Sequence, residues 1–195
     1  MTIRVPVTRP RPAPMQKLAK ILSITLLTSA TAVAAAAPVG YSINSDSASN
    51  QADSLYRIDL ATGNETRIGT VNSFGETRID VEGLAFAPDG TLYGIDDSAL
   101  TLFPLNTDNG TVQTVNEVTL KDLPFGGSND FGMTFACDGT LYVTSVTRGA
   151  LYRVSLDGQT TEIGPLGSDA RISALAAYGE NPVRLYGLGN GLDAD

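Results

Sequence analysis

The sequence predicts an all-β fold built from β-propeller-like repeats, each repeat being one four-stranded antiparallel sheet. First, residues 84–97 and 133–146 are 49 positions apart and identical at 7 of 14 positions. Second, the hexapeptide Leu55–Leu60 recurs as Leu151–Leu156, at about twice that spacing. Third, short β-compatible runs alternate with Gly, Asp and Asn turns, and no helical period persists. A repeat of about 48 residues suits one four-stranded propeller blade.

The second repeat shows the expected order of strands most clearly. Asp89-Gly90 marks a tight turn between its first two strands, because Gly tolerates positive φ and Asp hydrogen-bonds its own backbone. Asp108-Asn109-Gly110 marks the turn before its last strand. The four strands expected in this repeat are 83–87, 91–95, 100–105 and 112–115.

The repeats do not add up to a closed ring. The first copy begins at its second strand, at 41–43, and the last copy ends after its second strand, at 185–188. Counting in this way gives 13 strands, or about three and a quarter blades. Propellers close with typically 4–8 blades, so we expect an incomplete propeller or a fragment. Three alternatives remain open: missing blades in a longer chain, a homodimer, or an open arc, and we favour the first two.

The amino terminus predicts an export signal. Residues 1–37 hold five basic residues and no acidic one, followed by an apolar run at 21–27 and a tract of small residues that ends in four alanines. This order is typical of a secretory signal peptide. We therefore expect residues 1–37 to be cleaved, residues 38–195 to form the repeat domain, and the product to be periplasmic or extracellular. An uncleaved membrane anchor is the alternative, whereas cleavage leaves no stable membrane insertion.

The net charge argues against nucleic-acid binding. The chain carries −8 in total, and loss of residues 1–37 leaves 8 basic against 21 acidic residues, a net charge of −13. Such a chain is repelled by phosphate backbones. The absence of His excludes His-dependent triads and His-ligated zinc, and the single Cys137 excludes an internal disulfide. We expect the Cys137 thiol to be partly shielded.

Residues 82–93, Glu-Gly-Leu-Ala-Phe-Ala-Pro-Asp-Gly-Thr-Leu-Tyr, resemble the blade signature of gluconolactonase/regucalcin-like and NHL-like propellers. The segment 129–135 resembles the start of another such blade. The resemblance implies a divalent cation, Ca²⁺ or another ion, on the central axis. By position, Glu82 matches the family's glutamate, and Asn129 or Asp130 matches a later ligand. Carboxylate and amide oxygens suit a hard ion such as Ca²⁺.

Three functional hypotheses follow, and the chain is not assigned firmly as an enzyme. The favoured one is an exported, non-enzymatic binding module that takes a protein or glycan on a loop face. The alternatives are a metal-dependent lactonase-like hydrolase, and a truncated propeller without independent activity. We expect the neighbouring acids Asp96 and Asp97 to lie in a solvated loop, and Arg57 and Arg153 to be exposed on their strands. The repeated tyrosines are expected to pack between sheets.

Overall fold

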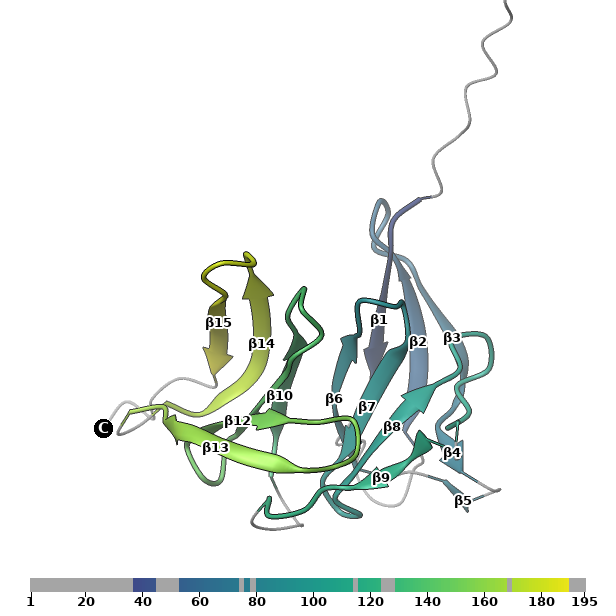
Figure 1. The fold of residues 1–195 in the computed structure, drawn as a ribbon. Coiled ribbons are helices and arrows are strands. Elements are labelled where there is room, and N and C mark those ends of the chain that lie inside the picture. Colours follow the sequence, from purple (N-terminus) through teal and green to yellow (C-terminus); the bar gives the residue numbers. More distant parts are fainter. Residues whose placement is uncertain are drawn as a thin grey trace, which may run out of the picture. The chain divides into compact units, whose positions relative to one another are not determined.

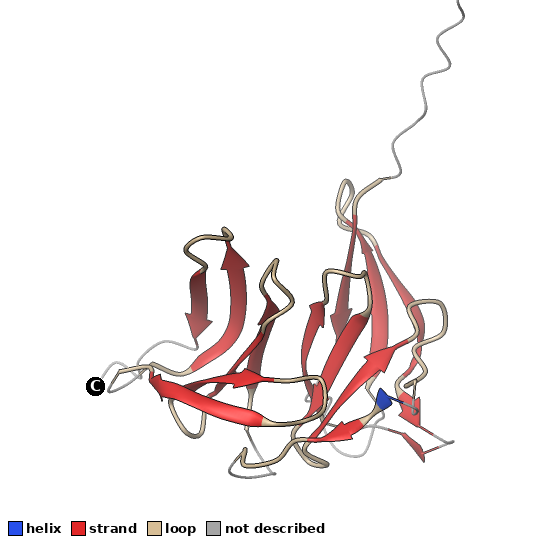
Figure 2. Ribbon diagram, in the orientation of Figure 1, coloured by secondary structure: helices blue, strands red, loops and turns tan. Residues whose placement is uncertain are grey.

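The computed structural model describes residues 37–44, 53–73, 76–77, 80–113, 116–123, 129–167 and 170–189. These residues form strands and turns, with one short helical turn at Asn116 (Figure 2). Nearly all of the predicted signal peptide, residues 1–36, lies outside the described residues, so cleavage and export remain predictions. None of the helical structure in the described ranges is long and apolar enough to cross a membrane.

Four antiparallel sheets follow one another along the chain and confirm the predicted repeat architecture (Figure 1). The first sheet lacks the innermost strand of a four-stranded blade, and the fourth sheet has only the first two strands. The strands in sheet order are β1 (Val39–Ile43), β2 (Ser54–Asp59) and β3 (Glu65–Thr70), then β6 (Val81–Phe86), β7 (Leu92–Asp96), β8 (Thr101–Leu105) and β9 (Val118–Thr119), then β10 (Phe131–Phe135), β11 (Leu141–Ser145), β12 (Ala150–Val154) and β13 (Thr160–Pro165), and finally β14 (Ile172–Tyr178) and β15 (Arg184–Gly189).

Two details of the second repeat were not predicted from the sequence. A small hairpin of β4 (Asn72–Ser73) and β5 (Glu76–Thr77) follows the first sheet. The predicted outer strand 112–115 of the second sheet is confirmed at its start, where Val112 bridges Leu105 and the Gln113 N–H donates a 2.8 Å hydrogen bond to the Pro104 carbonyl. Residues 114–115 lie outside the described residues, and pairing with β8 continues at β9.

The Asp-Gly turns form as predicted. In the second sheet the Asp89 carboxylate accepts a hydrogen bond of 2.9 Å from the backbone N–H of Thr91, and Gly90 has a φ of 87°. The third sheet repeats this geometry with Asp138 and Thr140, whose contact is 2.8 Å. Cys137, in the same turn, is exposed rather than shielded, because the turn projects beyond the strands on both sides.

The sheets stack through two apolar cores. One core joins the first and second sheets, with Leu55 and Phe103 fully buried in it. The other joins the second and third sheets, with Ile95 and Tyr152 at its centre. The innermost strands also contact one another in chain order, β6 with β10 and β10 with β14, and β1 contacts β6. This order of contacts is that of neighbouring propeller blades.

Candidate functional site

Buried acidic side chains link one sheet to the next. Asp53 lies just before β2, and its Oδ2 accepts a hydrogen bond of 2.7 Å from the backbone N–H of Val81. Asp97 follows β7, and its Oδ2 accepts one of 2.7 Å from the backbone N–H of Asn129. Both aspartates are at most 1% exposed. Each therefore satisfies a buried donor at the start of the next sheet's innermost strand, and an unsatisfied donor there is costly.

The carboxyl of Asp97 has a strongly perturbed acidity. Burial raises its pKa most, and the hydrogen bond and negative charge of Asp80 raise it further, to about 7, although the Asn129 N–H opposes the shift. Asp96, the residue before Asp97, is also buried and accepts a 2.6 Å hydrogen bond from the backbone N–H of Ala99. The expectation that Asp96 and Asp97 lie in a solvated loop was therefore wrong.

The residues predicted to hold a cation lie in, or directly before, the innermost strands of the second and third sheets. Glu82 is half-buried in β6, at a register shift between Val81 and Gly83. The two candidates from the later repeat, Asn129 and Asp130, directly precede β10. The Asn129 amide is 1% exposed, and its oxygen accepts hydrogen bonds from Ser145 Oγ (2.9 Å) and the Thr147 N–H (3.0 Å). These two bonds occupy the amide oxygen that the cation would need.

Across the described ranges, no three Asp, Glu or Cys side chains gather closely enough to hold a metal ion. The cation site at Glu82, Asn129 and Asp130 therefore stays a prediction. If it exists, calorimetric titration with Ca²⁺ is expected to give a dissociation constant below the ~10⁻³ M limit of weak calcium modules. The Glu82→Gln variant would then lose that binding. Wild-type protein without such an affinity would contradict the prediction.

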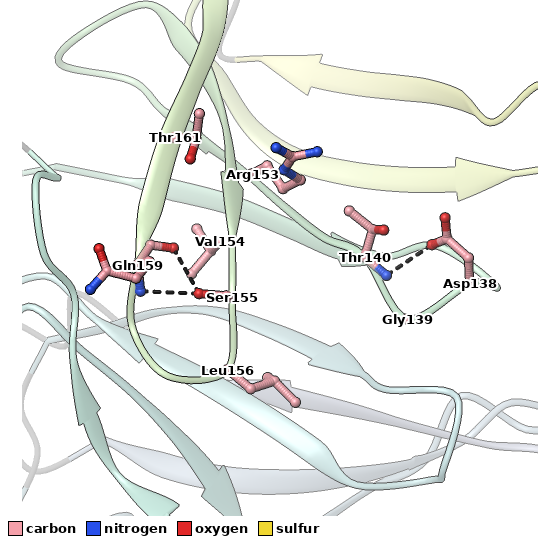
Figure 3. Close-up of a pocket in the computed structure, with 9 residues that line it drawn as sticks. All are labelled: Asp138, Gly139, Thr140, Arg153, Val154, Ser155, Leu156, Gln159 and Thr161. Atoms are coloured by element: carbon pink, nitrogen blue, oxygen red, sulfur yellow. Dashed lines mark hydrogen bonds between the residues drawn. The ribbon is translucent and has the colours of Figure 1, made fainter.

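A shallow pocket lies between two turns of the third sheet, as Figure 3 shows. Its volume is about 450 Å³. One wall is the β10–β11 turn, and the other is the β12–β13 hairpin (Figure 3). The lining residues are Asp138, Gly139, Thr140, Arg153, Val154, Ser155, Leu156, Gln159 and Thr161.

The pocket combines one cation, Arg153, and one anion, Asp138, with hydroxyl and amide groups. Arg153 is exposed, as predicted, and no hydrogen bond or ion pair joins it to another described residue. The Thr140 N–H lowers the pKa of Asp138, which is therefore ionised at neutral pH. Ser155 Oγ accepts a 3.1 Å hydrogen bond from the Gln159 N–H, which holds the hairpin wall in shape (Figure 3). The chemistry suits a polar ligand that carries acidic groups and hydroxyls.

Only part of this pocket could be predicted from the amino-acid sequence. The repeated Leu-Tyr-Arg hexapeptide predicts an exposed arginine, but it occurs twice, at Arg57 and at Arg153. Nothing in one strand indicates that the Asp138 turn stands beside Arg153, because the two are joined only by the register of β11 with β12.

Comparison with known proteins places the chain among repeat proteins. Residues 40–168 match a family described as a repeat of unknown function, DUF6923. This match confirms that the core of the chain is a repeat, as the sequence predicts. A search of curated proteins gave no match.

Solved β-propeller-type structures resemble the chain over part of their length. A gluconolactonase from Xanthomonas campestris has 18% identity and a TM-score of 0.49, over 80% of this chain and 52% of that one. Regucalcin from Agrobacterium tumefaciens, a calcium-binding protein, has 21% identity and a TM-score of 0.44, over 66% and 41%. Virginiamycin B lyase from Staphylococcus aureus has 15% identity and a TM-score of 0.43, over 63% of this chain and 38% of that one. The chain spans about half or less of each of these proteins.

Proposed function

Since this chain belongs to a family described as a repeat of unknown function, DUF6923, we propose that its repeats form an exported, non-enzymatic binding module. The ligand is a glycan or a protein, held on the loop face of the third sheet. The pocket chemistry favours a glycan that carries carboxylates. Export rests on the signal peptide predicted over residues 1–37.

The single observation that carries the proposal is the exposed guanidinium of Arg153 in a pocket of hydroxyl and amide groups. Arg binds carboxylates with paired, charge-assisted hydrogen bonds. Thr140 and Thr161 can hydrogen-bond sugar hydroxyls. A pocket of this size accommodates one or two sugar units at the surface.

The acid–base properties of the pocket also favour binding over hydrolysis. Asp138 carries the only carboxyl group of the lining, and its lowered pKa leaves it no proton to donate at neutral pH. The acid with a raised pKa, Asp97, does not line the pocket and instead caps a backbone donor in the interior. The two roles that acid–base hydrolysis needs therefore do not meet in this pocket.

The proposal predicts that Arg153→Ala weakens the binding of uronic-acid oligomers by at least about tenfold, since one charge-assisted contact contributes ~1.5–3 kcal/mol. Isothermal titration with oligogalacturonate measures this, with a neutral glucose oligomer of equal length for comparison. Arg57→Ala is the matched control, because Arg57 holds the same place in the repeat but does not line the pocket. Equal loss in both variants, or no binding of oligogalacturonate by the wild-type protein, would contradict the proposal.

A further inference from the structure

Among the described residues, nothing covers one surface of the third sheet whose counterpart in the first sheet is packed against a neighbouring sheet. We call Ile163, Gly164 and Gly167 the acceptor strip. Ile163 is 54% exposed, but Ile68, its equivalent in the first sheet, packs into the core between the first and second sheets. Burying an isoleucine contributes ~1.5–3 kcal/mol, so the exposed copy is a surface suited to a partner.

The glycines of the acceptor strip are likewise open, although their equivalents in the first sheet are in close contact with the second sheet. A Cβ on Gly69 would lie 2.2 Å from the backbone oxygen of Asn109, because the second sheet's outer turn presses against it. Its equivalent Gly164 has nothing within 4 Å of such a Cβ. Asn72 forms a parallel backbone bridge to Thr111 of that turn, and its equivalent in the third sheet, Gly167, is likewise open. The strip thus repeats a docking site for an outer turn.

The first sheet carries the matching surface at the opposite end of the stack. We call Tyr56, Ile58 and Gly63 the donor face. Tyr152 and Val154, which repeat Tyr56 and Ile58 in the third sheet, are 2% and 3% exposed because they pack on the second sheet. Tyr56 and Ile58 are only half-buried.

The turn glycines complete the donor face. Gly110 and Gly158, in the outer turns of the second and third sheets, lie against the backbone of the preceding sheet. A Cβ on Gly158 would be 2.2 Å from the oxygen of Thr119. Gly63 holds the same place in the first sheet, with a similar φ of 76°, and a Cβ there would meet nothing within 4 Å. The first sheet therefore presents the contact surface of an outer turn, and no sheet in the described ranges lies beneath that turn.

We propose that the donor face of a second copy of this chain docks on the acceptor strip, so that two copies associate head to tail. The argument is continuity with the two interfaces inside the chain. At both, a turn glycine of one sheet, Gly110 or Gly158, lies against the outer strand of the preceding sheet, and apolar residues at equivalent positions pack in the core beside it. The incoming Gly63 turn lies against Gly164, as Gly110 lies against Gly69. The backbone of the incoming Asn64 pairs with Gly167, as Thr111 pairs with Asn72.

The inner strands fit this arrangement if one strand gives way. β1 and β15 hold the same second place in their sheets, next to the innermost strand. β15 has Tyr186 and Leu188 at 58% and 74% exposed, whereas every residue of β1 is half-buried. The incoming β1 therefore replaces β15 beside β14, and each junction becomes one four-stranded sheet. Two copies then form a ring of six sheets, within the ~4–8 blades of closed propellers.

Docking leaves the pocket of the third sheet open. Arg57 and Thr66 hold the places of Arg153 and Thr161 in the first sheet, and both are exposed although the second sheet covers Ile68 nearby. Arg153 therefore stays accessible in the pair of copies. Failure of the association would leave the Arg153 binding prediction intact, and the reverse also holds.

The test measures the mass of the purified protein in solution by light scattering, over a series of concentrations. The wild-type protein is expected at twice the mass of one chain. Ile163→Glu on the acceptor strip and Gly63→Asn on the donor face are each expected to weaken association by at least about tenfold. Both positions are open in the single chain, and Asn tolerates positive φ, so both variants should fold.

Two control substitutions change the same residue types elsewhere. Leu156→Glu adds a charge at an equally exposed position, whose repeat Leu60 stays 58% exposed beside the second sheet. Gly90→Asn changes a turn glycine with a φ of 87° and open space. Both controls are expected to associate like the wild-type protein.

Mixing the two disabled variants tests the head-to-tail geometry directly. Each variant alone has no intact interface in a pair, but the Ile163→Glu chain keeps a donor face that fits the Gly63→Asn chain's acceptor strip. The mixture is therefore expected to recover pairs with one interface. A wild-type protein of single-chain mass, a variant that pairs alone as well as the wild type, or a mixture that stays single-chain would each overturn the proposal.

Discussion

Replacing Gly69 by alanine is expected to destabilise the repeat domain by at least about 3 kcal/mol, beyond the usual range for an added methyl group. The new Cβ would lie 2.2 Å from the Asn109 oxygen and 3.0 Å from its carbonyl carbon. Both contacts are backbone, so no side-chain rotation relieves them. The first and second sheets must separate locally, which exposes the core around Leu55 and Phe103. Urea denaturation followed by circular dichroism measures the loss.

Gly40→Ala is the matched control for this substitution. Gly40 is also a strand glycine of the first sheet, but a Cβ there meets only the tip of the Leu60 side chain, at 3.1 Å. A flexible, exposed side chain can move aside, so we expect a change within about 1 kcal/mol. Equal effects of the two alanines would show that the Gly69–Asn109 approach does not hold the sheets together.

Asp97→Asn is expected to remove much of the pH dependence of stability between pH 5 and pH 8. The pKa of Asp97 is raised from 3.8 to about 7 in the folded protein, so the folded state binds the proton more tightly than the unfolded state does. Its contribution is complete below pH 3.8 and is lost as the pH rises through 7. The wild-type free energy of unfolding should therefore fall by on the order of 3 kcal/mol from pH 5 to pH 8.

The asparagine variant keeps the structural contact while abolishing the titration. Its amide oxygen can still accept the hydrogen bond from the Asn129 N–H, which Asp97 accepts at 2.7 Å. At pH 8 we expect Asp97→Asn to be more stable than the wild-type protein, and Asp97→Ala to be less stable than Asp97→Asn because it leaves that N–H unpaired. Urea denaturation at a series of pH values measures all three. Parallel pH profiles of wild type and Asp97→Asn would contradict this account.

The repeated strand and turn motifs predicted the sheets because paired strands are close to each other in the sequence. Turn residues such as Asp89 and Asp138 act on neighbours two positions away, so their sequence alone fixes the geometry. The prediction was incomplete for the outer strand of the second sheet: Val112 bridges β8 as expected, but the sequence did not predict β9, which begins six residues later at Val118. Pairing with β8 decided that position, and strand pairing depends on tertiary contacts that no single segment contains.

The candidate site divides in the same way. The exposure of Arg153 follows from the alternation of its strand, but the pocket around it needs the register between β11 and β12. For Asp97 the sequence-based prediction was wrong. Two consecutive acids after a strand predict a solvated loop, but Asp97 is buried, where its carboxylate accepts a hydrogen bond from a backbone N–H that lies 32 residues later in the chain. Sequence patterns indicate charge, whereas only the fold shows which distant donor needs that charge.

By itself, the sequence determined the repeat length, the order of the four sheets along the chain, their Asp-Gly turns and the acidic composition. These properties depend on contacts within one repeat and on composition. Only the tertiary structure decided which equivalent residues are covered, as with Ile68 in the core and Ile163 at the surface. The physical reason is that a residue on the face of one sheet is buried only by the sheet packed against it. Two equivalent segments therefore differ in burial when only one of them has a neighbouring sheet.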